Sequence, residues 1–101
     1  MSSVTEGDAG ALEKLTIESA FRDAGIDPIQ CVALVNIWFN VVFLGCKYSI
    51  SDYEAVFRAL DLIDDREVRL SARVRLRVAL LRHAAEVDDG GILSNFLRSS
   101  A

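Results

Sequence analysis

The sequence predicts an all-α domain, a small bundle of four main helices with a short C-terminal turn or helix. Apolar residues recur at helical spacing, start and stop residues separate the periodic segments, and the one strand-like segment has no matching partner strand. With 101 residues, 51% of them hydrophobic, the chain has the length of one domain with a modest core. We expect helices at about residues 11–24, 28–44, 52–63 and 65–87, in a single helical domain of residues 11–101 after a flexible segment of residues 1–10.

Clear stop and start signals separate the first two predicted helices. The apolar residues of 11–24 approximate a helical stripe, and Gly25 stands where a left-handed residue after the helix is favoured. Asp27 is a good N-cap residue, and Pro28 fits the first helical position. Apolar residues then continue to Gly45. A short connection between two helices follows from this pattern.

A capping box marks the start of the third predicted helix. Ser51 and Glu54 stand three residues apart, so that each side chain can accept a hydrogen bond from the other's free backbone N–H. The apolar residues that follow have helical spacing without a gap: Tyr53, Val56, Phe57, Leu60 and Ile63.

The fourth segment can be interpreted in two ways. Residues 68–78 alternate strictly between apolar and other residues, which is typical of a strand. Alanine, leucine and arginine are good helix formers, however, and Asp64 can cap a helix here. We therefore predict a helix, followed by an apolar tail that docks as a turn or short helix. In the helical interpretation one face carries Leu70, Val74, Val78, Leu81 and Ala85, and a different face carries Leu76, Leu80, Ala84 and Val87.

The second predicted helix is apolar on more than one side. One seam contains Cys31, Leu34, Val35, Trp38 and Val42, and another contains Ile29, Val32, Asn36, Phe39 and Phe43. A helix that is apolar nearly all round must be covered nearly all round. Either the other helices cover both seams, or one seam faces a second protein, and we favour the second protein. A membrane span is disfavoured, because the apolar stretch is short and contains two asparagines.

Polar residues in the second seam support an association surface. Asn36 lies at its middle, like the polar residues that fix register in paired helices, and Asn40 on the adjoining face could add a rim hydrogen bond. Twofold assemblies are the commonest soluble oligomers, so we expect a homodimer that also binds another protein. Which seam forms the dimer and which meets the partner is left open. The expected protein-binding or dimer seam comprises Ile29, Val32, Asn36, Phe39, Asn40 and Phe43.

The charges are segregated along the chain. Residues 1–65 carry 4 basic and 11 acidic side chains, whereas residues 66–83 carry six arginines against one glutamate. The arginines could line a phosphate backbone or an acidic partner, or could pair with the chain's own acidic helices. No recognisable DNA-binding motif surrounds them, so nucleic-acid binding is disfavoured. We expect a charged rim that orients a protein partner, formed by Arg69, Arg73, Arg75 and Arg77.

Catalytic and metal-binding patterns are not recognisable in the sequence. His83 is the single histidine and has no nucleophile motif around it, and the acidic pairs stand at helix ends, where caps and turns explain them. We therefore expect no enzyme, no cofactor and no metal. Residues 1–10 lack the features of a secretory signal, and Cys31 and Cys46 fit a reducing compartment, so we expect a cytoplasmic protein.

The surplus apolar surface predicts a protein-interaction module. A small, acidic, helical protein whose apolar residues concentrate between Gln30 and Leu44 is similar to the bacterial quorum-sensing antiactivators, which bind LuxR-type transcription activators. The resemblance implies a role in transcription regulation, in which the chain sequesters an activator by covering its apolar dimerisation surface. Two alternatives remain: a nucleic-acid-binding regulator that uses residues 66–82, and a small ligand-binding helical protein with a pocket beside Trp38.

Overall fold

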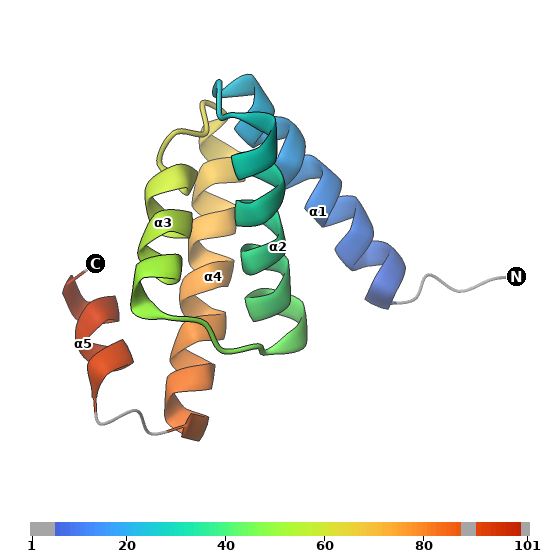
Figure 1. Ribbon diagram of the computed structural model, residues 1–101. Coiled ribbons are helices and arrows are strands. Elements are labelled where there is room, and N and C mark those ends of the chain that lie inside the picture. Colours follow the sequence, from blue (N-terminus) through green and yellow to red (C-terminus); the bar gives the residue numbers. More distant parts are fainter. Residues whose placement is uncertain (1–5, 88–90, 100–101) are drawn as a thin grey trace, which may run out of the picture.

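A computed structural model of the chain describes residues 6–87 and 91–99, which form five α-helices and no strand (Figure 1). The predicted all-α bundle is therefore confirmed. Helices α2, α3 and α4 run side by side, α1 packs mainly on α2, and α5 packs on α4. The helices are α1 (Glu6–Asp23), α2 (Pro28–Leu44), α3 (Ile50–Leu60), α4 (Arg66–Val87) and α5 (Ile92–Ser99).

The ends of α2 follow the sequence signals. The Asp27 Oδ2 atom accepts hydrogen bonds from the backbone N–H groups of Ile29 at 3.1 Å and Gln30 at 3.3 Å. Pro28 occupies the first turn, where its missing N–H has no intrahelical partner to lose. Gly45 ends the helix with a φ of 68°, in the left-handed region that glycine adopts at low cost.

Asp27→Ala is expected to lower the free energy of unfolding by about 1 kcal/mol, because two backbone donors at the start of α2 lose their side-chain acceptor. Urea denaturation followed by circular dichroism measures the change. Asp27→Asn serves as the control, since asparagine is an equally good N-cap residue and should retain most of the stability. A loss equal in both variants would show that the cap does not stabilise α2.

Helix α3 begins earlier than predicted. Its N-cap is Ser49, whose Oγ accepts from the Asp52 N–H, while the Asp52 side chain accepts from the Ser49 N–H, both at 3.3 Å. The predicted capping box of Ser51 and Glu54 is therefore wrong, and Ser51 lies inside the helix. Starting the helix at Ile50 lets that partly buried side chain pack against the core.

Helix α4 confirms the helical interpretation of the alternating segment. Asp65 caps it, with Oδ1 accepting from the Val68 N–H at 3.1 Å, so the cap lies one residue after the predicted Asp64. Helix α3 ends at Leu60, before the predicted residue 63. Ile63 nevertheless remains buried in the connection between the two helices. The predicted apolar tail forms α5, which buries Leu93 and Leu97.

Helix α1 begins at Glu6, earlier than the predicted residue 11, so residues 6–10 belong to the helix and not to a flexible segment. Residues 1–5 of that segment lie outside the described residues. Helix α1 approaches α2 closely at Gly10, which is buried, and a Cβ atom there would lie only 3.0 Å from Cε1 of Phe39. The second turn of α1, at Gly10, therefore rests directly on α2.

The core lies between α2 and the three helices that surround it. Cys31, Leu34, Val35 and Trp38 of the first predicted seam are buried, and Val41 joins them. Val42, predicted in the same seam, is only partly buried. Within the residues that the structure describes, no helix is both long enough and apolar enough to cross a membrane.

Candidate protein-binding surfaces

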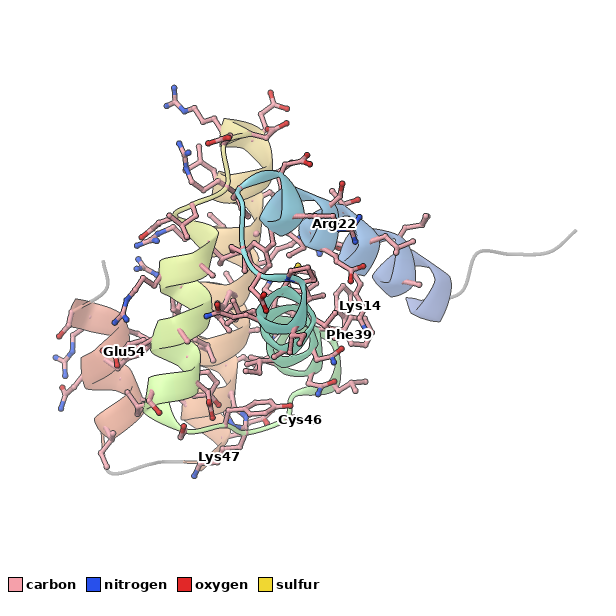
Figure 2. The ribbon with its side chains drawn as sticks, turned by 45° about the horizontal axis from the view of Figure 1, so that its top comes forward. Lys14, Arg22, Phe39, Cys46, Lys47 and Glu54 are labelled. Carbon is pink, nitrogen blue, oxygen red and sulfur yellow. The ribbon has the colours of Figure 1, made fainter. Side chains whose placement is uncertain are left out.

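The predicted binding seam of α2 is divided into a covered half and an open half. Phe39 and Phe43 are partly buried, with ring centroids 5.0 Å apart, and both lie beneath the first turns of α1 at Gly10. The Lys14 Nζ atom lies 5.3 Å from the centre of the Phe39 ring (Figure 2). These two phenylalanines therefore hold α1 on α2, and they offer little surface to another protein.

The open half of the seam lies toward the start of α2. Ile29 is 82% exposed and Val32 is about half exposed, while Asn36 is exposed beside them. Asn40 was expected at the rim of a contact, but its Nδ2 atom donates to the Tyr48 hydroxyl of the same chain at 2.7 Å. The structure thus leaves Ile29 and Val32 as the apolar part of this seam that a partner could cover.

A second apolar surface runs along the outward side of α4. Its four side chains are each 45–60% exposed, although they are leucines and valines. Residues spaced by four, four and three positions share one face of an α-helix. The opposite face of the same helix is the core face. We call the exposed surface the α4 stripe; it comprises Leu70, Val74, Val78 and Leu81.

The spacing of these four residues predicts that they share one face of the helix, but it does not predict that this face is exposed. Both faces of α4 are apolar, because Ala72, Leu76 and Leu80 occupy the opposite side. Local periodicity can assign residues to faces but cannot tell which of two apolar faces meets the core. The small side chain of Ala72 lets a neighbouring helix approach, and this is the one sequence feature that favours its face for the core.

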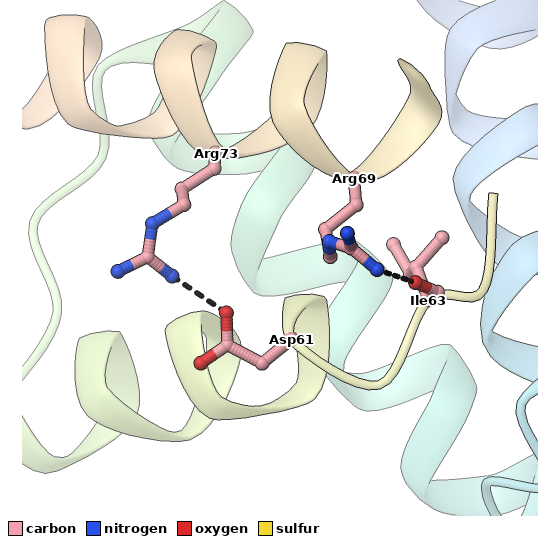
Figure 3. Close-up of polar contacts among 4 residues, drawn as sticks. All are labelled: Asp61, Ile63, Arg69 and Arg73. Carbon is pink, nitrogen blue, oxygen red and sulfur yellow. Dashed lines mark hydrogen bonds and ion pairs between the residues drawn. The ribbon is translucent and has the colours of Figure 1, made fainter. Parts of the chain in front are cut away.

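The predicted charged rim is engaged within the chain. Arg73 Nη1 donates to Asp61 Oδ1 at 2.7 Å, and Arg69 Nη1 donates to the Ile63 carbonyl at 2.9 Å (Figure 3). Arg75 Nη1 donates to Glu13 Oε2 at 2.8 Å. These contacts join α4 to the end of α3 and to α1.

The other three arginines of α4 differ in whether they interact within the chain. Arg77 also has an interaction within the chain, so all four predicted rim arginines are occupied. Arg66 and Arg82 are exposed, and no ion pair holds either of them among the described residues. The arginine segment therefore acts mainly as a brace between helices, which leaves less free positive charge for a phosphate backbone than the sequence suggests.

The grooves of the protein are open and lie away from the predicted ligand pocket. A groove of about 620 Å³ runs between α1 and the start of α4, with Leu12, Leu15 and Val68 among its walls. Trp38, beside which a ligand pocket was considered, is fully buried in the core. Over residues 6–87 and 91–99, no group of three potential metal ligands is found.

The histidine and the two cysteines differ in their exposure to solvent. His83 of α4 is buried. Cys31 is buried with its Sγ donating to the Glu18 carbonyl at 3.4 Å, and this burial raises the pKa of the thiol. Cys46 is exposed in the connection after α2 (Figure 2).

Comparison with known proteins finds no relative: no protein-family model matches the chain, and neither does a curated protein or a solved structure.

Proposed function

We propose that this chain is a protein–protein interaction module that acts by binding, and that the α4 stripe is its principal contact surface. The observation that carries this proposal is the exposure of four large apolar side chains in one line on the outward face of α4. Single exposed apolar residues are ordinary on protein surfaces, whereas a contiguous apolar surface marks an association site.

The size of the stripe supports a contact with another helix. From Leu70 to Leu81 it extends for about 16 Å along the axis at 1.5 Å per residue. An amphipathic helix of the partner, laid along such a surface, would anchor apolar residues at matching intervals. A regulatory protein could in this way cover the apolar dimerisation surface of a transcription activator, which is the role that the sequence resemblance implies.

The stripe needs neighbouring contacts to hold a partner. A large apolar side chain contributes about 1.5–3 kcal/mol when it is fully removed from water. The four side chains are about half exposed, so covering them contributes on the order of 3–6 kcal/mol. Association itself costs roughly 4–15 kcal/mol. Polar and apolar groups beside the stripe must therefore contribute to any stable complex.

Substituting Val74 tests the proposed function. Val74 is 60% exposed at the middle of the stripe, so Val74→Glu should leave the fold intact but place a charge in the contact. We expect the variant to lose at least tenfold in the amount of protein that cross-links to it in its native cells, including further copies of itself. Quantitative mass spectrometry of the cross-linked products measures this loss.

Leu62→Glu provides the matched control for Val74→Glu. Leu62 is 55% exposed in the turn between α3 and α4, apart from the stripe. This variant carries the same change in charge and should retain the wild-type set of cross-linked proteins. Equal cross-linking by both variants and the wild type would reject the stripe as a binding surface.

The open half of the α2 seam is the second candidate surface, because Ile29 is the most exposed large apolar residue in the part of the chain that the structure describes. Ile29→Glu in the same cross-linking experiment reports whether this surface contributes. If Ile29→Glu lowers the amount of cross-linked protein and Val74→Glu does not, the binding surface lies on α2 and not on α4.

A further inference from the structure

We propose that a second copy of this chain covers the α4 stripe, with the two α4 helices antiparallel about a twofold axis between Val74 and Val78. The inference rests on the proposed function, since it names the partner of the same surface. In this arrangement Glu67 of each copy lies three residues, about 4.5 Å along the axis, from Arg82 of the other, a distance that the long arginine side chain can span to form an ion pair. A second copy is favoured by the spacing of the stripe and by the charges at its ends.

The spacing of the stripe makes it self-complementary. When the helix is reversed about the point between Val74 and Val78, these two residues exchange places, and Leu70 comes within one residue, about 1.5 Å along the axis, of Leu81. A twofold contact requires one patch that complements itself in this way. Side chains on two antiparallel helices can then interdigitate, at the axis separation of about 8–10 Å that helix packing allows.

Two of the arginines beside the middle of the stripe are already neutralised within the chain. Arg73 is paired with Asp61 at 2.7 Å, and Arg75 with Glu13 at 2.8 Å. Arg77 likewise has an interaction within its own chain. Two copies of α4 can therefore approach at this point with Arg73 and Arg75 already paired to carboxylates, which reduces the repulsion that would otherwise oppose a symmetric contact.

The free charges lie at the two ends of the stripe and have opposite signs. Glu67 stands seven residues before Val74, and Arg82 stands four residues after Val78, so both extend the outward face of α4. Both are exposed, and neither is held by an ion pair within the described part of the chain. Antiparallel helices bring the acidic end of one stripe to the basic end of the other. Parallel helices would instead bring like charges together.

The surface beside the stripe can enlarge the contact. On the side facing α2, a shallow hollow of about 270 Å³ is lined by Val42, Val74, Val78 and Arg82, among others. Val42 is the partly buried member of the α2 core seam. Because stripe residues line this hollow, a second copy on α4 would also lie against α2. A contact along two helices is closer to the area of a stable dimer than one helix face alone.

Sedimentation velocity over a concentration series tests the oligomeric state. We expect the wild type and Leu62→Glu to sediment as dimers at micromolar concentration, and Val74→Glu to sediment as a monomer with unchanged helicity. A wild type that stays monomeric up to millimolar concentration would overturn the inference. A dimer that persists in Val74→Glu would also overturn it, because the contact would then lie elsewhere.

A charge exchange tests the antiparallel register. Glu67→Arg and Arg82→Glu should each weaken the dimer at least tenfold in Kd, because each places like charges opposite one another at both ends of the contact. The double variant, with both substitutions, re-forms the pairs with their signs exchanged and should return to within about threefold of the wild-type Kd. Failure of the double variant to recover would reject this register.

The same variants separate this inference from the proposed function. If the wild type is monomeric but Val74→Glu loses a different cross-linked protein, the proposed function stands and the second copy is rejected. If Val74→Glu changes neither the oligomeric state nor the cross-linked proteins, both proposals fail. The monomer can instead be tested with vesicles of phosphatidylglycerol and phosphatidylcholine. If it binds them and Val74→Glu does not, the stripe contacts a lipid surface, and both the proposed function and the second copy are rejected.

Discussion

Leu76→Asp is expected to unfold the protein at 25 °C, whereas Val74→Asp, two residues away on the same helix, leaves it folded. Leu76 is completely buried on the core face of α4, and Val74 is 60% exposed on the outward face. A carboxylate placed at Leu76 would lose its hydration and find an apolar environment, at a cost of several kcal/mol in addition to the lost packing. That cost is comparable to the total stability of a small domain, about 5–15 kcal/mol.

Circular dichroism of the two variants measures this difference directly. The Leu76 variant should lose its helical signal, and the Val74 variant should melt within a few degrees of the wild type. Alanine substitutions give a quantitative version: about 2–5 kcal/mol lost at Leu76, and within about 0.5 kcal/mol of the wild type at Val74. Equal losses at the two positions would mean that the α4 stripe is buried within the same chain, which would contradict its proposed role.

Most of the fold could be predicted because its signals are local. Asp27 and Pro28 start α2, Gly45 ends it, and the structure places all three as the sequence predicted. The alternation at 68–78 is typical of a strand, but a strand requires a partner strand and the sequence offers none of matching quality. The helix-forming residues of this segment predict a helix, and the structure confirms it. Element type in this chain therefore depends on residues that lie close together in the sequence.

Helix starts were predicted less well where two capping residues compete. Ser49 and Ser51 each precede an acidic residue by three positions, so each can form a capping box. Asp64 and Asp65 can each cap α4, and the structure uses Asp65. Tertiary packing can choose between such alternatives, and in the observed helix, which begins after the earlier serine, Ile50 packs against the core.

The binding surfaces were predicted only in part because coverage is a tertiary property. The excess of apolar faces on α2 was recognised from the sequence, but α1 covers Phe39 and Phe43 with turns that were expected to be flexible. The α4 stripe was recognised as a face of a helix, without its exposure. A surface is defined by what remains uncovered, and this depends on where every other helix lies.

Which arginines remain unpaired also depends on the tertiary structure. The sequence places Arg73 and Arg75 in a basic segment that could meet a partner or pair with the chain's own acidic helices, and the fold brings Asp61 and Glu13 to them. Glu13 is distant from Arg75 in the sequence, so only the packing of α1 beside α4 creates that pair. A segregation of charge along the sequence is therefore as consistent with ion pairs between helices of the same chain as with binding to a charged partner.

Trp38→Ala is expected to destabilise the protein by about 3–5 kcal/mol, because it leaves a large cavity at the centre of the core. Trp38 is completely buried on α2 and packs edge-on against Phe43 with ring centroids 5.7 Å apart. Since it is the single tryptophan, urea denaturation should be followed by circular dichroism and not by fluorescence. Ile29→Ala on the same helix is the control, and at 82% exposure it should change stability by less than about 0.5 kcal/mol.

Trp38→Phe separates the packing of the indole from its polar group. The Nε1 atom is buried without a hydrogen-bond partner among the described residues, so phenylalanine removes an unsatisfied donor along with part of the ring. We therefore expect Trp38→Phe to cost about 1–2 kcal/mol, well below the alanine variant. A phenylalanine variant as unstable as the alanine variant would show that the indole N–H is bonded in the folded protein. It would also show that the core around α2 depends on that bond as well as on apolar packing.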